Sequence, residues 1–202
     1  MSQQVDWGPP RAERADAARN RQVLLATARR MIAEHGADKL TMDGLAERAG
    51  LGKGTVYRRF VTRAGIFQAL LDDYERRFQA NVLSGLPPLG PGAEPLDRLM
   101  AYGRARIEFL IRHSDIARAA LDGRELVPAG SQTPISRVHI RALLGQLSLG
   151  ADLDILATQL TSALDGPLLL YLSADTITQA GLGFSERLGA GWDDLIRRVC
   201  RP

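Results

Sequence analysis

The sequence predicts an all-α fold with a small N-terminal helical domain and a larger C-terminal helical domain. Thirty Leu, 27 Ala and 24 Arg stand against 27 β-branched residues in the 202-residue chain, a composition that favours helix. Apolar side chains recur at helical spacing along most of the chain. No segment alternates apolar and polar residues convincingly as a half-buried strand would, and there is no internal repeat. A chain of this length can build its own hydrophobic core.

The first expected elements are an arm and two helices. Residues 1–18 are rich in glycine, proline and charge and have few large apolar side chains, so we expect a flexible arm. An apolar stripe predicts a helix over residues 19–35. Thr41 is expected to cap a second helix over residues 42–49, which Gly50 ends after barely two turns.

A third, short helix is expected over residues 53–60. Together with the preceding short helix and turn it forms a compact unit of the helix-turn-helix kind. With Val56 and Phe60 inward, rotation by about 100° per residue places Gly54 about 160° and Arg58 about 200° from Val56. Both therefore point outward. Glycine costs about 1 kcal/mol in a helix relative to alanine, and a close approach to another surface would explain its use here.

Charge is distributed unevenly and indicates a polyanionic partner. Up to Arg63 the balance of Lys and Arg over Asp and Glu is +5, and beyond it the balance is −2. Such an excess suits nucleic acid, although a chance cluster of solvated arginines remains open. The helix over 53–60 offers cations and hydroxyls that suit phosphate oxygens and base edges. Its candidate side chains are Lys53, Thr55, Tyr57, Arg58 and Arg59.

The run LTMDGLAERAGLGKGTVYRRF (residues 40–60), followed by Thr62 and Arg63, closely resembles the DNA-binding domain of the tetracycline repressor (TetR/AcrR) family of bacterial transcriptional regulators. The likeness covers about residues 18–71. It implies that the helix over 53–60 enters the major groove of double-stranded DNA and that the start of the preceding helix touches phosphates. Carried over by position, the implied DNA-binding residues are Thr41, Lys53, Gly54, Thr55, Tyr57, Arg58, Arg59 and Arg63.

Two positions depart from the family pattern. Gly52 stands where the family usually has serine, so the third helix has a weaker cap. Arg59 stands where histidine or tyrosine is common. Because Arg59 lies about 60° from the core side, we expect it to reach towards a phosphate and not to read a base. Tyr57 and Arg63 are also expected on phosphates.

The remainder reads as a series of amphipathic helices. Thr62 is expected to cap a long helix, and the proline- and glycine-rich stretch 84–95 must be a loop. We divide the chain into a helix-turn-helix domain over residues 19–65 and an effector-binding and dimerisation domain over 66–202. Further helices are expected over residues 96–113, 116–125, 135–149, 153–173 and 185–199.

The resemblance implies a homodimer that responds to a small-molecule effector and binds a palindromic operator. The dimer helices would be those at 153–173 and 185–199. The run 167–172 is apolar all round, as expected of a helix covered on every side, by a partner or by its own core. Pro167 should kink that helix or start a new segment.

An effector pocket is expected among the helices between residues 96 and 149. Four side chains share a face at helical spacing and mix aromatic surface with polar heads. An ordinary core face with polar tips in solvent is the alternative. The four residues are Tyr102, Arg106, Phe109 and His113.

No feature of the sequence indicates an enzyme. The three histidines lack paired spacing for zinc, and the glycines at 50, 52 and 54 follow a helix where a phosphate loop requires a strand. We expect no cofactor and no metal. A single cysteine, Cys200, and no apolar run near 18 residues favour a cytoplasmic, nucleoid-associated protein without membrane contact. The alternative function is a non-catalytic small-molecule sensor that lacks sequence-specific DNA binding.

Overall fold

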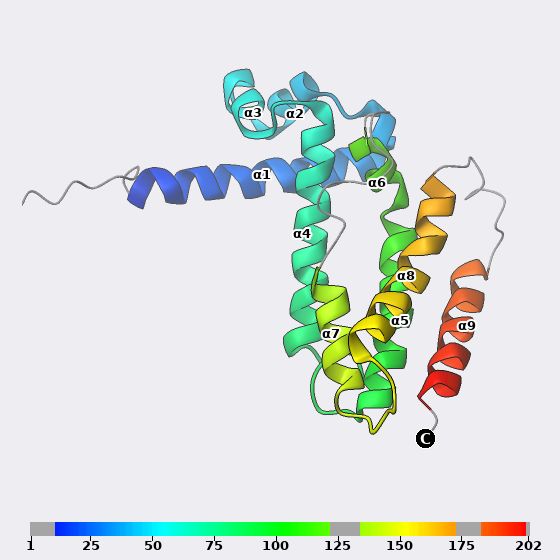
Figure 1. Ribbon diagram of the computed structural model, residues 1–202. Helices are drawn as coiled ribbons and strands as arrows, with labels where there is room; N and C mark the ends of the chain where they lie inside the picture. The colour runs from blue at the N-terminus through cyan, green and yellow to red at the C-terminus, as the bar shows by residue number, and fades with distance from the viewer. Residues whose placement is uncertain (1–10, 122–133, 173–182, 201–202) are drawn as a thin grey trace, which may run out of the picture. The chain divides into compact units, whose positions relative to one another are not determined.

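The structure is a computed structural model that describes residues 11–121, 134–172 and 183–200, and within these ranges it contains helices and no strand. This confirms the all-α expectation. None of the described helices is both long and apolar enough to span a bilayer. The elements, drawn in Figure 1, are α1 (Arg11–His35), the 3₁₀ helix η1 (Ala37–Lys39), α2 (Met42–Ala49), α3 (Lys53–Phe60), α4 (Arg63–Ser84), α5 (Pro95–Arg112), α6 (Ser114–Leu121), α7 (Pro134–Leu144), α8 (Leu153–Leu172) and α9 (Phe184–Val199).

The chain divides into two compact units, one up to Leu70 and one from Leu71 onward. In the first unit, α2 packs against both α1 and α3. Its core is built from apolar side chains that recur at helical spacing, which is why these helices form and why they meet. The fully buried members are Leu24, Leu25, Ala28, Leu40, Leu45, Val56, Ile66, Phe67 and Leu70.

Helix α1 corrects the expected arm. The arm was expected over residues 1–18, but the helix begins at Arg11 and not at Arg19. Four alanines with Glu13 and Arg14 fill the interval, and these residue types favour helix strongly enough to extend it without an apolar stripe. Residues 1–10 lie outside the described ranges.

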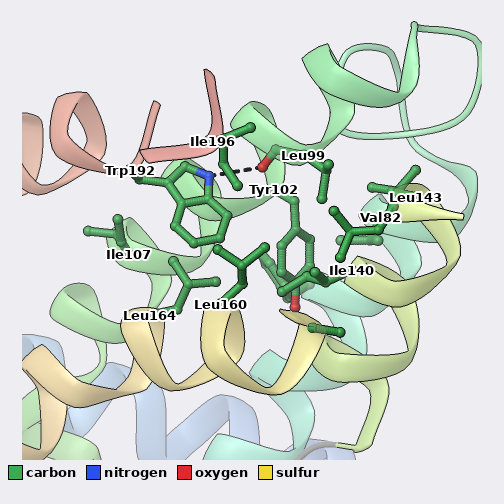
Figure 2. Packing of buried hydrophobic residues seen from close by; sticks show 13 residues of the cluster. Val82, Leu99, Tyr102, Ile107, Ile140, Leu143, Leu160, Leu164, Trp192 and Ile196 are labelled. Atoms are coloured by element: carbon green, nitrogen blue, oxygen red, sulfur yellow. Dashed lines mark hydrogen bonds between the residues drawn. The ribbon is translucent and has the colours of Figure 1, made fainter. Parts of the chain in front are cut away.

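The second unit packs α5 against α9 and α7 against α8. Figure 2 shows the centre of this core, where Trp192 of α9 lies against α5. The indole Nε1–H of Trp192 donates to the Leu99 carbonyl oxygen at 3.0 Å. A β-carbon at Gly103 would lie 2.0 Å from that indole ring, so this close approach of α9 to α5 requires glycine. The buried cluster also contains Phe78, Val82, Tyr102, Ile107, Ile140, Leu143, Leu144, Ala157, Leu160, Leu164 and Ile196.

Two expected helix ends are revised or fall outside the described residues. Helix α7 ends at Leu144 and not at residue 149, because the N–H groups of Gln146 and Leu147 donate to carbonyls three residues back and form turns instead. Helix α6 is described only to Leu121. The side chains of residues 167–172 lie outside the described residues, so the expected covering of that run stays a prediction.

Candidate nucleic-acid interface

Helix α2 begins and ends at the predicted residues. The Thr41 hydroxyl oxygen accepts the Gly44 backbone N–H at 3.1 Å, which satisfies one of the N–H groups that a helix start leaves open. Gly50 takes the left-handed conformation with φ 65° and closes the helix. Thr41 is exposed, so its O–H remains available at the helix start.

Helix α3 presents the face that the rotation argument predicted. Val56 and Phe60 are buried and fix the helix against the first unit's core. Gly54, Tyr57 and Arg58 are exposed, and Tyr57 shows 48% of its surface to solvent. Thr55 is half-buried on the flank. Arg58 makes no hydrogen bond or ion pair within the described part of the chain, so its guanidinium is available to a partner.

Gly54 leaves an opening on this face. A β-carbon placed there would meet nothing within 4 Å. Gly54→Ala is therefore expected to stabilise the protein by about 0.5–1 kcal/mol through helix propensity, yet to weaken DNA binding by holding the backbone off the groove. Thermal unfolding and DNA affinity measured on the same variant check this. Equal DNA affinity would mean that this backbone does not approach DNA.

Two cations lie on the flanks of the α3 face. The Lys53 ammonium lies 2.8 Å from Asp43 Oδ2 in the first turn of α2, and this hydrogen bond raises the pKa of Lys53. Arg59 Nη2 donates to the Ala17 carbonyl of α1 at 3.4 Å. The sequence did not identify Asp43 as the partner of Lys53, because no regular spacing in the sequence marks a contact between residues ten apart on two helices. Arg59 thus has a bond within the unit, and its expected contact with a phosphate stays a prediction.

The junction between α3 and α4 is sharply turned. Val61 ends α3 with φ 63°, a conformation that costs a β-branched residue about 1–3 kcal/mol. The Thr62 hydroxyl oxygen then accepts the Gly65 N–H at 3.1 Å, as the predicted cap of α4. The chain therefore turns from α3 into α4 at the strained Val61, and Thr62 caps the start of α4.

Arg63, whose expected contact with a phosphate stays a prediction, is bonded within the first unit. Its Nε donates to the Leu40 carbonyl at 2.7 Å and its Nη2 to the Ala37 carbonyl at 2.8 Å, and its guanidinium lies 4.9 Å from the Phe67 ring centre. These contacts tie the start of α4 to the segment just before α2. Arg63 therefore positions the helix-turn-helix from within, and two of its N–H groups are already bound.

Three of the four expected effector residues lie on α5 in the second unit, and the fourth, His113, is the C-terminal cap of that helix. Arg106 is only 3% exposed, and its Nη1 donates to Glu75 Oε2 of α4 at 2.6 Å. Tyr102 donates from its hydroxyl to Ser136 of α7 at 2.7 Å. Phe109 lies with its ring centre 4.6 Å from that of His113. Tyr102 belongs to the buried core and Phe109 packs against it, as the alternative of a core face predicts, but the polar tips of Tyr102 and Arg106 do not reach solvent.

Burial shifts the proton affinities of this cluster. Desolvation lowers the pKa of His113 and lowers that of His139 on α7 to about 4, so both imidazoles are neutral at pH 7. Desolvation also raises the pKa of Asp165 on α8, against the opposing effect of Arg106. Among the residues that the structure describes, Arg106 Nε and His139 Nε2 are buried without a hydrogen-bond partner.

The sequence missed Glu75 and Asp165, which act on Arg106, and His139, whose ring centre lies 4.9 Å from that of Tyr102. Each lies on a different helix from Arg106, and only tertiary packing brings them together. Within the described ranges, no three His, Cys, Asp or Glu side chains are placed to hold a metal ion.

The known proteins that this chain matches are transcriptional regulators. Residues 24–70 match the family described as bacterial regulatory proteins, tetR family. The chain is 26% identical over 194 residues to the HTH-type transcriptional repressor AcnR of Corynebacterium diphtheriae, a match that covers 94% of this chain and 92% of that protein. An uncharacterised HTH-type transcriptional regulator of Mycobacterium bovis is 46% identical over 46 residues, 23% of each chain.

Solved structures share the fold at low sequence identity. A TetR-family transcriptional regulator from Pectobacterium atrosepticum has a TM-score of 0.69 and 22% identity, covering 96% of this chain and 99% of that chain. AibR, solved in complex with isovaleryl coenzyme A and operator DNA, has a TM-score of 0.53 and 18% identity, covering 91% and 99%. These likenesses extend over both units of the chain.

Proposed function

We propose that the chain is a member of the TetR family of bacterial regulatory proteins, whose model matches residues 24–70, and that it is a ligand-responsive repressor that binds a palindromic operator as a homodimer. The observation that carries the proposal is the exposed face of α3, with an open glycine beside an unpaired arginine. A short helix fixed by two buried apolar residues can enter a major groove and present that face to base edges. The proposed DNA face comprises Thr41, Gly54, Thr55, Tyr57 and Arg58, with Lys53 and Arg59 on its flanks.

Arg58→Ala tests which side of α3 reads DNA. Arg58 points furthest from the core, and a bidentate contact to guanine contributes about 1–3 kcal/mol. The variant should lose about that much binding free energy in each half-site, measured by fluorescence anisotropy with a duplex that the wild type selects. Arg112→Ala, which removes an exposed arginine from α5 in the second unit, is the matched control and should bind normally. Normal binding by Arg58→Ala would mean that another face enters the groove.

Dimerisation through α8 and α9 would give the two-fold symmetry that an inverted-repeat operator requires. Each helix buries one face inside the second unit, with Leu160 and Leu164 on α8 and Trp192 on α9. The opposite faces stay exposed in the single chain, including Ile155 on α8. Sedimentation at micromolar concentration should give a dimer. A monomer would contradict this part of the proposal.

Effector control would act through the second unit. The structural neighbour AibR was solved with both a coenzyme A thioester and operator DNA. Here the proposed effector contacts are Tyr102, Arg106 and Phe109 of α5 and His113 at its C-terminal cap. An inducer must bind the state that does not fit DNA more tightly, because a ligand with equal affinity for both states shifts nothing. A compound that binds tightly and leaves DNA affinity unchanged is therefore not the inducer.

A further inference from the structure

Asp43 and Lys53 form an ion pair that joins α2 to α3. Lys53 Nζ and Asp43 Oδ2 lie 2.8 Å apart, with the carboxylate in the first turn of α2 and the ammonium on the first residue of α3. The side chains are 68% and 55% exposed, respectively. As an ion pair, the two side chains carry no net charge although they lie at the surface of the DNA-binding unit.

Lys53 does not lie on the same side of α3 as Arg58. Rotation at about 100° per residue places Lys53 about 60° from the buried Val56, whereas Arg58 lies about 200° away. Lys53 therefore lies on the flank that faces α2, where its ammonium donates to the Asp43 carboxylate. Its position suits a contact within the protein better than a contact with a base edge.

An unpaired carboxylate at this place would oppose DNA binding. Asp43 stabilises α2, because a negative charge in the first turn complements the helix dipole. It also lies in the same helical turn as Thr41, the proposed phosphate contact. A phosphate there would be well within the Debye length of about 8 Å, so its repulsion by a bare carboxylate would be little screened.

We propose that Lys53 serves operator binding by neutralising Asp43, and that the two residues enter the DNA complex as one neutral pair. Lys53 then adds no phosphate contact of its own, and the pair adds no net charge to the DNA face. This inference rests on the proposed function. The competing possibility is that Lys53 leaves Asp43 and binds a phosphate directly.

A double-mutant cycle measured against salt separates these possibilities. The variants are Lys53→Met, Asp43→Asn and the double variant, each titrated with a wild-type-selected duplex between 50 and 200 mM KCl (roughly the range over which salt slopes are resolved). Lys53→Met should weaken binding about tenfold by leaving the carboxylate bare. Asp43→Asn should strengthen binding and steepen the salt slope by about 0.9 per protomer, because Lys53 is freed. The double variant should bind within about twofold of the wild type, with an unchanged slope.

A matched ion pair in the second unit provides the control. Arg112 pairs with Glu108 one turn away on α5, and the two side chains are 67% and 60% exposed. Arg112→Met and Glu108→Gln should leave DNA affinity and salt slope unchanged. Circular dichroism of every variant should show the wild-type helix content, because both pairs are exposed.

Two results would overturn the neutral-pair proposal. A double variant as weak as Lys53→Met would show that Lys53 binds DNA itself. Weaker binding by Asp43→Asn would show that Asp43 orients Lys53 towards DNA or contacts it. A wild-type chain that selects no sequence would instead refute the proposed function, and this inference with it, so the two failures are distinguishable.

Discussion

Arg106→Met is expected to lower the free energy of unfolding by roughly 3–5 kcal/mol, the usual cost of removing one partner from a buried ion pair. The Glu75 carboxylate would stay mostly buried after losing a hydrogen bond of 2.6 Å. The ring faces of Phe78 and Phe109, whose centres lie 5.7 and 5.2 Å from the guanidinium carbon, would lose their cation. Urea unfolding followed by circular dichroism measures the loss.

Two further variants isolate the cause of that loss. Arg112→Met removes an exposed arginine from the same helix, where it pairs with Glu108 one turn away, and should cost no more than about 0.5 kcal/mol. Replacing Arg106 and Glu75 together by Met should recover much of the stability, because the uncompensated buried charge is then gone. If Arg106→Met were as stable as the wild type, the ion pair between Arg106 and Glu75 would not contribute to the free energy of unfolding.

Gly103→Ala is expected to destabilise the second unit by roughly 2–4 kcal/mol, more than the helix propensity of alanine can offset. The added β-carbon would lie 2.0 Å from Cε2 and Nε1 of Trp192, a ring that is 4% exposed and has no free space to move into. The indole would have to shift and weaken its hydrogen bond to the Leu99 carbonyl, which contributes about 1 kcal/mol.

Thermal unfolding measures this effect, and a loss of about 3 kcal/mol would lower Tm by roughly 6–12 °C in a chain of this size. Gly191→Ala on α9 is the matched control, because a β-carbon there would meet nothing within 4 Å. It should be neutral or slightly stabilising. Equal Tm values for Gly103→Ala and Gly191→Ala would contradict the tight approach of α9 to α5.

The sequence predicted features that depend on one helix at a time. Val56 and Phe60 are buried, Gly54 and Arg58 point outward, and Thr41 caps α2, because each follows from helical rotation or from local hydrogen bonding. The four-residue row on α5 came from the same reasoning. Its burial, however, depends on which helices pack around it.

Features that depend on two helices could not be predicted in the same way. Arg63 bonds carbonyls at Ala37 and Leu40, 26 and 23 residues before it, and no periodicity marks such a pair. The partners Asp43 and Glu75 were missed for the same reason. The early start of α1 was missed because an alanine-rich stretch has helix propensity without an apolar face to reveal it.

Operator recognition by the α3 face can be tested by selecting binding sites from random double-stranded DNA, in parallel with the wild type and Arg58→Ala. We expect the wild type to select an inverted repeat and Arg58→Ala to relax the preference at one position in each half-site. A wild-type protein that enriches no sequence would contradict operator recognition. An inverted repeat that Arg58→Ala leaves unchanged would contradict the assignment of the α3 face that reads it.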